Sequence, residues 1–466
     1  MPEPTDAPAG PLPARLGMWD AVSIIVGIVI GSTIFKSSGS IAAGVSTPWA
    51  MFGVWLAGGA LSLVGALCYA ELAATYPRSG GDYVWLTRAF GPLAGFLFGW
   101  AHLAGILTGS IGVLAFVFAD HAQRLWNLPD AAGPLVAIAA VVGLTLMNVL
   151  GVFFGKATQN VLTAAKVAGL AAIAVAGLSA GHAVPAASHE PSGGGLGMAM
   201  ILVLYAYGGW NDAAFVAAEI RDPRRNIPRA LLVGVGLVTL VYLAVNAAYC
   251  RALGWEGLQR SELPAADTLR AVFGPTGDRA MSVLVLVSAL GGINGLILTG
   301  SRVHASLGRD HRVFAVLGRW HPRLHTPVWS LAAQCAITTL LVGAVGLPAG
   351  REAIDAVLTR LGQGGVDWAR YGGGFETLVS ATAPIFWTFF LLTGLALFAL
   401  RDQDREVERA FRVPLYPFVP FAFCLTCTWM LNASILWAGP LALLALVPFM
   451  LGVPLYAFSR RMRPAS

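Results

Sequence analysis

The feature of this sequence that most limits its fold is a series of apolar stretches, each about 20 residues long, with few internal charges. In a lipid bilayer every backbone N–H and C=O group must find its partner within the protein, and a helix of about 20 residues meets this requirement while crossing the hydrocarbon. The chain of 466 residues is 56% hydrophobic and only 12% charged, about half the charged fraction of a soluble protein. The sequence therefore predicts an all-α membrane protein.

These stretches predict twelve transmembrane helices. Their expected spans are residues 19–43, 48–75, 89–119, 133–153, 156–180, 196–219, 229–252, 278–306, 327–347, 376–400, 413–436 and 438–459. They divide into five helices, five helices and a final two, as in a protein with a five-plus-five inverted repeat. The expected divisions are a disordered N-terminal tail at 1–17, a first repeat at 18–195, a second repeat at 196–402, and the last two helices with a short C-terminal tail at 403–466.

The basic residues are distributed unevenly between the two expected sides of the membrane. About 20 of the 30 Lys and Arg fall in the loops assigned to one side, and loops of this kind face the cytoplasm. We therefore expect both termini in the cytoplasm and an integral protein of a bacterial-type inner membrane. The net charge of +6 then indicates membrane orientation rather than binding of nucleic acid.

Two of the apolar stretches are interrupted near their centres by small and polar residues. Residues 30–35 read IGSTIF and residues 205–211 read YAYGGWN, about 175 residues later. Each interruption falls in the first helix of a group of five, and such a matched pair indicates the binding site of a secondary transporter. The simpler alternative is that these glycines only let neighbouring helices pack closely.

An interrupted helix can bind both ends of a zwitterion. The N–H groups that begin the second half-helix, at Gly31, Ser32 and Thr33, favour a carboxylate. The carbonyls that end the first half-helix favour an ammonium. Two facing breaks can therefore hold an α-amino acid by its backbone. At the second break the aromatic residues can close over a small ligand, with Tyr205 the best placed.

Among the charged residues inside expected spans, Lys166 and Asp212 are candidates for a role in transport. Lys166 is about 15 Å from the cytoplasmic end of its helix, and a charge at this depth costs about 2.5–3.5 kcal/mol. It can donate hydrogen bonds to unwound carbonyls of the first helix, or it can lose its proton, and in either role it would replace a coupling sodium ion. Alternatively, its side chain snorkels to the membrane interface. Asp212 could form an ion pair with Lys166, bind a cationic substrate or hydrogen-bond a neighbouring helix. Ser288 belongs to a stripe of small and polar residues on its helix. Such a stripe either packs against a neighbouring helix or leaves room for a substrate.

Other patterns exclude several classes of protein. The sequence has no phosphate-binding loop, zinc motif or nucleophile elbow, so we expect neither an ATP-driven pump nor an enzyme, and no cofactor. His321 and His325 have no further ligands nearby in the sequence, so we expect no metal site. Cys424 and Cys427 form a C-x-x-C inside an apolar helix, where two small packing residues are the simpler interpretation.

Several motifs resemble those of the amino acid–polyamine–organocation transporters, and within them the L-type amino acid transporter group. The motifs are IIVG at 24–27, GSTIF at 31–35, GALCYAEL at 65–72, SGGDY at 79–83, YAYGGWN at 205–211, NG at 294–295, SR at 301–302 and FRVP at 411–414. The resemblance covers about residues 19–459. It implies the five-plus-five fold with two extra helices and amino acid transport by alternating access.

The resemblance also implies roles for individual residues. The main-chain N–H groups of Ser32 and Thr33 would receive the substrate carboxylate, and the carbonyls of Val29 and Ile30 would receive the amino group. Six positions are expected to shape the pocket or its gate, either from the same resemblance or from their place at the second break. They are Tyr205, Tyr207, Gly208, Trp210, Asn211 and Trp387. Lys166 corresponds to a lysine that takes the place of a sodium ion in related carriers.

The sequence departs from the group's pattern at three places. Thr33 replaces a glycine, and Asp212 replaces an aromatic residue common in the animal members. The loop at 120–133 lacks the cysteine that joins animal members to a heavy subunit, so we expect no disulfide-linked partner. Our leading hypothesis is a sodium-independent carrier of neutral L-amino acids that works by exchange or proton symport. The alternatives are a carrier of cationic amino acids or polyamines and a non-transporting sensor.

Overall fold

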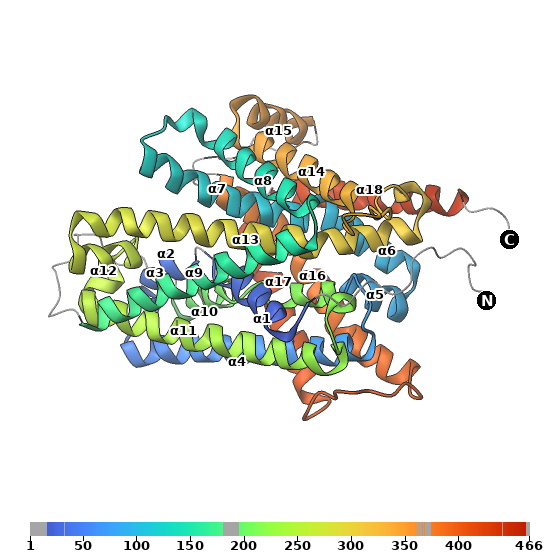
Figure 1. Ribbon diagram of the computed structural model, residues 1–466, viewed down its shortest axis with the longest axis horizontal. Coiled ribbons are helices and arrows are strands. Elements are labelled where there is room, and N and C mark those ends of the chain that lie inside the picture. Colours follow the sequence, from blue (N-terminus) through green and yellow to red (C-terminus); the bar gives the residue numbers. More distant parts are fainter. Residues whose placement is uncertain are drawn as a thin grey trace.

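In the computed structural model, residues 16–31, 33–179, 195–360, 374–439 and 441–462 are described, together with residues 362, 366 and 368. These residues form a bundle of helices that run mostly along the long axis of the molecule (Figure 1). Within the described ranges, β-type pairing is confined to a single bridge between Leu16 and Ile220. The expectation of an all-α chain is confirmed for this part of the protein.

The first half of the chain forms α1 (Met18–Val29), α2 (Thr33–Lys36), α3 (Ser38–Ala43), α4 (Pro48–Thr75), α5 (Asp82–Phe90), α6 (Pro92–Ala101), the π-helical turn η1 (His102–Ile106), α7 (Leu107–Trp126), the 3₁₀ turn η2 (Asp130–Ala132), α8 (Gly133–Val149) and α9 (Val152–Ser179). The second half forms α10 (Gly195–Ala206), the 3₁₀ helix η3 (Trp210–Glu219), α11 (Pro223–Arg260), α12 (Pro264–Phe273), α13 (Pro275–Asp310), the 3₁₀ turn η4 (Arg312–Phe314), α14 (Val328–Gly346), α15 (Pro348–Arg360), α16 (Gly374–Gln403), α17 (Phe418–Ala438) and α18 (Leu441–Arg461).

Each of the twelve expected spans coincides with one helix or with a run of consecutive helices. Eight helical segments of the described residues are long and apolar enough to cross a membrane, and α1 and α8 are shorter apolar helices. The exact number of crossings and the inverted repeat therefore stay predictions. The hydropathy pattern located α4 at its observed bounds, but it merged α1, α2 and α3 into a single span because all three are apolar.

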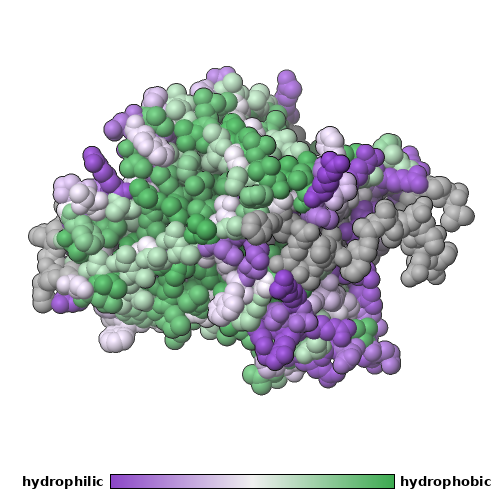
Figure 2. Space-filling model, viewed as in Figure 1, coloured by the Kyte–Doolittle hydropathy of each residue, from purple (hydrophilic) through white to green (hydrophobic). Residues whose placement is uncertain are grey.

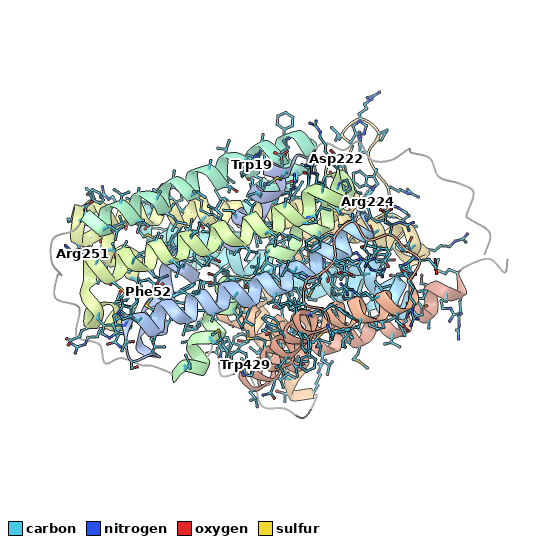
Figure 3. The ribbon with its side chains drawn as sticks, turned by 90° about the horizontal axis from the view of Figure 1, so that it is seen from below. Trp19, Phe52, Asp222, Arg224, Arg251 and Trp429 are labelled. Atoms are coloured by element: carbon cyan, nitrogen blue, oxygen red, sulfur yellow. The ribbon has the colours of Figure 1, made fainter. Side chains whose placement is uncertain are left out.

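Apolar side chains cover much of one face of the bundle. Figure 2 shows hydrophobic residues over this face, whereas hydrophilic residues gather at the end where α5 lies. The length of the apolar part is marked by α11, whose residues Arg224 and Arg251 lie near opposite ends of the bundle (Figure 3). A chain with this surface and these helices is an integral membrane protein.

The helix α1 lies at the centre of the bundle, where it contacts α9, α11, α13 and η3 (Figure 1). Its sequence is apolar around almost its whole circumference, as expected of a helix buried on all sides. Close packing requires a glycine at position 27, because a Cβ atom there would lie 2.0 Å from the Gln159 side-chain nitrogen. The start of α1 is held by the bridge to Ile220, in which Leu16 receives the Arg221 N–H at 2.9 Å.

Candidate functional site

Both interruptions expected from the sequence are breaks in the helices. α1 ends at Val29, and α2 begins at Thr33 after Gly31; Ser32 lies outside the described residues. α10 ends at Ala206, and the chain continues as a 3₁₀ helix after Gly209, whose φ of 100° favours glycine. Because each break leaves main-chain groups outside the helical hydrogen-bond pattern, both provide polar backbone atoms in the middle of an apolar bundle.

One side chain joins the two breaks. The hydroxyl oxygen of Tyr242, on α11, lies 3.0 Å from the carbonyl oxygen of Val29 and 2.9 Å from that of Ala206. Its single proton can be donated to one of these oxygens at a time. Tyr242 therefore stabilises the last carbonyl of α1 and the last carbonyl of α10 in adjacent positions, and nothing in the local sequence around residue 242 predicted this role.

The Lys166 side chain reaches the first break from α9. Its ammonium nitrogen donates to the carbonyl oxygens of Gly27 and Ile30, each at 2.6 Å, and the whole side chain is buried. Ser288, on α13, donates to the same Ile30 oxygen at 3.0 Å. Gly291, on the same helix as Ser288, lies beside the ammonium, where a Cβ atom would be in ordinary contact with the Lys166 nitrogen at 3.6 Å. Lys166 therefore does not snorkel to the interface.

The carbonyls expected to receive a substrate amino group already have partners in this structure. The Val29 oxygen accepts from the Gly31 N–H at 2.7 Å in addition to the Tyr242 hydroxyl. The Ile30 oxygen accepts from both Lys166 and Ser288. A carbonyl oxygen has two lone pairs, so an ammonium reaches either oxygen fully only if one of these donors moves.

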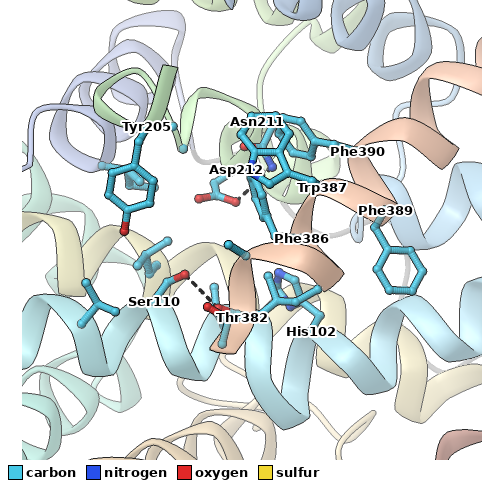
Figure 4. A pocket seen from close by; sticks show the side chains of 18 of the residues that line it. His102, Ser110, Tyr205, Asn211, Asp212, Thr382, Phe386, Trp387, Phe389 and Phe390 are labelled. Atoms are coloured by element: carbon cyan, nitrogen blue, oxygen red, sulfur yellow. Dashed lines mark hydrogen bonds between the residues drawn. The ribbon is translucent and has the colours of Figure 1, made fainter. Parts of the chain in front are cut away.

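A cavity of about 180 Å³ lies between the two breaks and the helices that face them (Figure 4). Its wall includes eight positions expected from the sequence, namely Val29, Gly31, Thr33, Tyr205, Gly208, Asn211, Asp212 and Trp387. Apolar side chains of α7 and α16, among them Leu107 and Phe386, form much of the remaining wall. In Figure 4 the Tyr205 ring and the Asp212 carboxylate extend into the same space.

Five other expected site residues lie behind this wall rather than on it: Ile30, Lys166, Tyr207, Trp210 and Ser288. The Tyr207 hydroxyl donates to the Trp55 carbonyl at 3.2 Å, and its ring packs on the Trp55 ring. Trp210 packs edge-on against Tyr69, with ring centroids 5.1 Å apart. These aromatic contacts hold the second break against α4.

Two titratable residues of the cavity wall were not among the sites expected from the sequence. The first is Asp82, at the start of α5, which was noted only within the SGGDY motif. Its Oδ1 atom accepts from Tyr69 and Thr393, each at 2.5 Å, whereas its Oδ2 atom is buried without a hydrogen-bond partner. The second is His102, in the π-helical turn η1, whose Nδ1 atom lies 3.3 Å from Nε2 of His304.

The acidic residues of the cavity lack counter-ions. Neither Asp82 nor Asp212 forms an ion pair with Lys or Arg in the described ranges, and Asp212 has only a 3.4 Å hydrogen bond from the Asn211 amide. Both carboxyl groups are almost fully buried and belong to residues that line the same cavity. A buried, unpaired carboxylate is costly, so this part of the cavity favours a proton or a positively charged or hydrogen-bond-donating group.

The ion pairs of the bundle lie elsewhere. Arg302 on α13 forms a buried, two-point ion pair with Glu219 at the end of η3, with distances of 2.7 and 3.1 Å. Arg401 forms a similar pair with Glu71, at 2.7 and 2.5 Å. Glu71 and Glu219 therefore each take part in a structural ion pair. Both pairs connect helices that are distant in the sequence.

A third ion pair lies at the exposed end of the bundle. The Arg88 side chain donates to the Asp404 carboxylate at 2.5 Å, and the Tyr76 hydroxyl donates to the same group at 2.6 Å. The hydrogen bond from Arg88 holds the pKa of Asp404 below its usual value. Burial and the hydrogen bond to Asp404 raise the pKa of Tyr76 to about 12.

Several known proteins are similar in sequence to this chain. Residues 16–451 match the model of the amino acid permease family. The chain is 29% identical to b(0,+)-type amino acid transporter 1 of Mus musculus, over 91% of this chain and 83% of the relative. It is 27% identical to the serine/threonine exchanger SteT of Bacillus subtilis (strain 168), over 98% of both chains. It is 30% identical to large neutral amino acids transporter small subunit 2 of Homo sapiens, over 96% and 80%.

One solved structure has a similar arrangement of helices. It is MHP1, a nucleobase-cation-symport-1 family transporter, in a closed conformation with bromovinylhydantoin bound. The TM-score is 0.57 at 14% sequence identity, and the match covers 99% of this chain and 96% of the other. At this identity the similarity concerns the fold alone.

Proposed function

Because the chain belongs to the amino acid permease family, and is therefore a transporter rather than an enzyme, we propose that it carries neutral L-amino acids by alternating access without sodium. The transport mode is exchange or proton symport, across a bacterial-type inner membrane with both termini in the cytoplasm. The observation that carries this proposal is the Lys166 ammonium at the first helix break, 2.6 Å from two carbonyl oxygens.

The position of Lys166 supports transport without sodium. Main-chain carbonyls at a broken helix are the ligands that a coupling cation would use. Here the fixed ammonium, together with the Ser288 hydroxyl, already binds those oxygens. A sodium ion would have to displace a covalently attached cation. The same lysine can take part in proton coupling, because its contacts with α1 change when it loses its proton.

The substrate backbone would lie between the two breaks. The main-chain N–H groups at Ser32 and Thr33 would receive its carboxylate, and the last carbonyls of α1 would receive its amino group once a present donor moves. Thr33 and Gly208 face the cavity that these groups surround. Tyr205 and Trp387 would close over the bound substrate, with Trp210 supporting the second break from behind. Substrate binding then favours the closed state through contacts made only there.

The size and wall of the cavity support a neutral side chain of small or medium size. Much of the lining is aliphatic or aromatic, and apolar lining with a few polar groups is typical of small-molecule sites. A specific observation favours a second candidate, a cationic amino acid or polyamine, because no Lys or Arg among the described residues pairs with Asp212 or Asp82 in the wall. The loop at 120–133 contains no cysteine, which supports a carrier without a disulfide-linked heavy subunit.

One reconstitution experiment tests the proposal. Purified protein in proteoliposomes is loaded with unlabelled amino acid, and uptake of labelled alanine and leucine is followed with and without sodium and a pH gradient. We expect uptake without sodium and competition by neutral amino acids. Dependence on sodium, or stronger competition by arginine or putrescine than by alanine and leucine, would contradict the proposal. Stimulation by internal substrate alone indicates exchange, and stimulation by the pH gradient alone indicates proton symport.

A further inference from the structure

The SGGDY motif at 79–83 forms a turn at its two glycines, and this turn places Asp82 against η3. Gly80 and Gly81 have φ angles of 114° and 47°, which residues with a Cβ atom rarely adopt. The Gly80 N–H donates to the Phe215 carbonyl of η3 at 3.0 Å, and a Cβ atom at Gly81 would lie 2.6 Å from the Phe215 ring. The turn therefore packs directly on the helix that follows the second break.

The Asp82 carboxyl group has two partners at one oxygen and none at the other. Its Oδ1 atom accepts from the Tyr69 hydroxyl of α4 and the Thr393 hydroxyl of α16, each at 2.5 Å. Its Oδ2 atom is buried without a hydrogen-bond partner among the described residues, and Asp82 lines the cavity. Oδ1 has two lone pairs in the carboxylate and in the protonated carboxyl group alike. A proton can therefore bind and leave Oδ2 while both hydrogen bonds to Oδ1 remain.

The titratable groups that face Asp82 come from three other elements. α4 contributes Tyr69, η3 contributes Asp212, and η1 contributes His102, the last two from the wall of the same cavity (Figure 4). α6, which packs on α5, carries no titratable residue. Only His102 of this set can carry a positive charge, and its Nδ1 atom contacts His304 rather than Asp82.

The arginines of the neighbouring helices pair with other acids. Arg302 of α13 binds Glu219, and Arg401 of α16 binds Glu71. Throughout the part of the chain that the structure describes, no Lys or Arg forms an ion pair with Asp82. A buried carboxylate without a cationic partner is costly, whereas a protonated carboxyl group carries no charge.

Two further observations favour a proton over a substrate cation at this position. A neutral amino acid brings no net charge into the mostly apolar cavity, so protonation is the way to remove the uncompensated charge of Asp82. Asp82 also lies between the candidate membrane spans Pro48–Thr75 and Pro92–Trp126. Burial raises the pKa of Asp82 to about 6, and the two hydroxyl donors act in the opposite direction.

We propose that Asp82 is the proton-binding residue of this carrier, and that one proton crosses the membrane with each amino acid. This proposal rests on the proposed function and chooses symport from its two transport modes. When the cavity opens to one side, the carboxylate takes a proton from water on Oδ2. When it opens to the other side, the carboxyl group returns that proton to water. Lys166 remains the fixed cation at the first break.

The test measures whether a pH gradient drives accumulation. Proteoliposomes without internal amino acid take up labelled alanine with the outside more acidic, or at equal pH, while valinomycin and equal potassium hold the membrane potential at zero. For one proton per amino acid, a gradient of about one pH unit should drive accumulation toward about tenfold. A pH dye inside the vesicles should report acidification when alanine is added.

The native protein alone separates two failures. If alanine exchanges with internal alanine but does not respond to the pH gradient, the carrier works by exchange and this proposal is overturned. If no labelled amino acid enters under any condition, the proposed function fails as well. Stronger competition by arginine than by alanine, without a gradient response, means that the carboxyl groups bind a substrate charge, which also overturns the proposal.

Variants assign the proton to one carboxyl group. Asp82→Asn keeps an acceptor oxygen but cannot exchange a proton, so the accumulation ratio should fall close to one and the dye signal should vanish. Asp82→Glu keeps a titratable group and should keep part of the response. Asp278→Asn changes an exposed carboxylate that pairs with Arg270 and is the matched control. A gradient response that persists in Asp82→Asn but is lost in Asp212→Asn overturns the proposal.

A second measurement decides the case in which Asp82→Asn is unfolded or inactive. Thr393→Val removes one donor to Oδ1, and loss of a hydrogen bond to the charged form favours the protonated form. The pH midpoint of uptake should therefore move upward by about one unit. Thr388→Val is the matched control on the same helix, because its hydroxyl donates to the Pro384 carbonyl. Equal midpoints in Thr393→Val, Thr388→Val and the native protein overturn the proposal.

Discussion

The ammonium nitrogen of Lys166 lies 2.6 Å from the carbonyl oxygen of Ile30, the residue at which α1 opens. The two residues are 136 positions apart and belong to different helices, α9 and the α1 break. The contact pairs the buried Lys166 charge with a carbonyl that also accepts from Ser288, and it gives that carbonyl a second partner inside an apolar bundle. It also ties the broken helix to α9, so a movement of α1 relative to α9 must stretch or break it.

Replacement of Lys166 therefore should abolish net transport. Lys166→Ala removes two charge-assisted hydrogen bonds, each worth about 1.5 kcal/mol or more, so we expect uptake to fall by about a hundredfold or more. Lys166→Met keeps the apolar stem and is the matched variant for packing. Uptake is measured in proteoliposomes from pH 5 to pH 8, with thermal unfolding as the test of folding. Unchanged uptake over this range would exclude Lys166 from the mechanism.

The side chain of Thr33 should limit which substrates fit. Thr33 begins α2 and lines the cavity, where its methyl and hydroxyl groups occupy space beside the expected carboxylate position. We expect Thr33→Gly to admit larger amino acids, such as phenylalanine, as competitors at concentrations about tenfold lower than for the native protein. A competition profile identical to that of the native protein would mean that the Thr33 side chain does not contact the substrate.

The Tyr242 hydroxyl should contribute to both breaks. Tyr242→Phe keeps the ring but leaves the Val29 and Ala206 carbonyls without this donor. Loss of one such hydrogen bond costs about 0.5–1.5 kcal/mol, so we expect a small loss of thermal stability and a larger loss of uptake. Tyr249→Phe on the same helix is the control, because its hydroxyl has only a 3.4 Å contact with Ile34. Equal effects of the two variants on uptake would argue against a special role for Tyr242.

The buried pair of Arg302 and Glu219 should be important for stability. The Arg302 and Glu219 side chains are 1% and 3% exposed, and removal of one partner leaves an uncompensated charge that costs about 3–5 kcal/mol. We expect Glu219→Ala to lower the unfolding temperature markedly. Arg302→Lys should also destabilise, because an ammonium cannot reproduce the two-point contact of the guanidinium. Unfolding temperatures within error of the native value would show that the pair contributes nothing measurable.

The exposed pair of Arg88 and Asp404 predicts a pH effect. The pKa of Asp404 is lowered in the folded protein, mainly by the hydrogen bond from Arg88. A lowered pKa means that this contact stabilises the fold above the usual pKa of an aspartate, near 4, and that the stabilisation is lost as the pH falls through the folded pKa. We expect Asp404→Asn to lower thermal stability modestly at pH 7, since Arg88 is about half exposed. The difference from the native protein should shrink below pH 4.

Much of the fold follows from local patterns in the chain. The span of α4 could be placed from hydropathy, because about 20 apolar residues in succession can exist in a bilayer only as a helix. The breaks near Gly31 and Gly209 could be placed because small and polar residues interrupt an apolar run in both halves. The need of Lys166 for a partner also followed from its sequence position, since a charge at that depth is costly without one.

The composition of the cavity wall, by contrast, depends on contacts between distant segments. His102 meets His304 across 202 positions, and Asp82 meets Thr393 across 311. Hydropathy and helix periodicity report only which residues share a local face, so they carry no information about such partners. Apolar runs, helix breaks and the buried lysine are thus properties of the chain itself. Which polar groups line the cavity was decided only when packing brought α5, η1, η3 and α13 together.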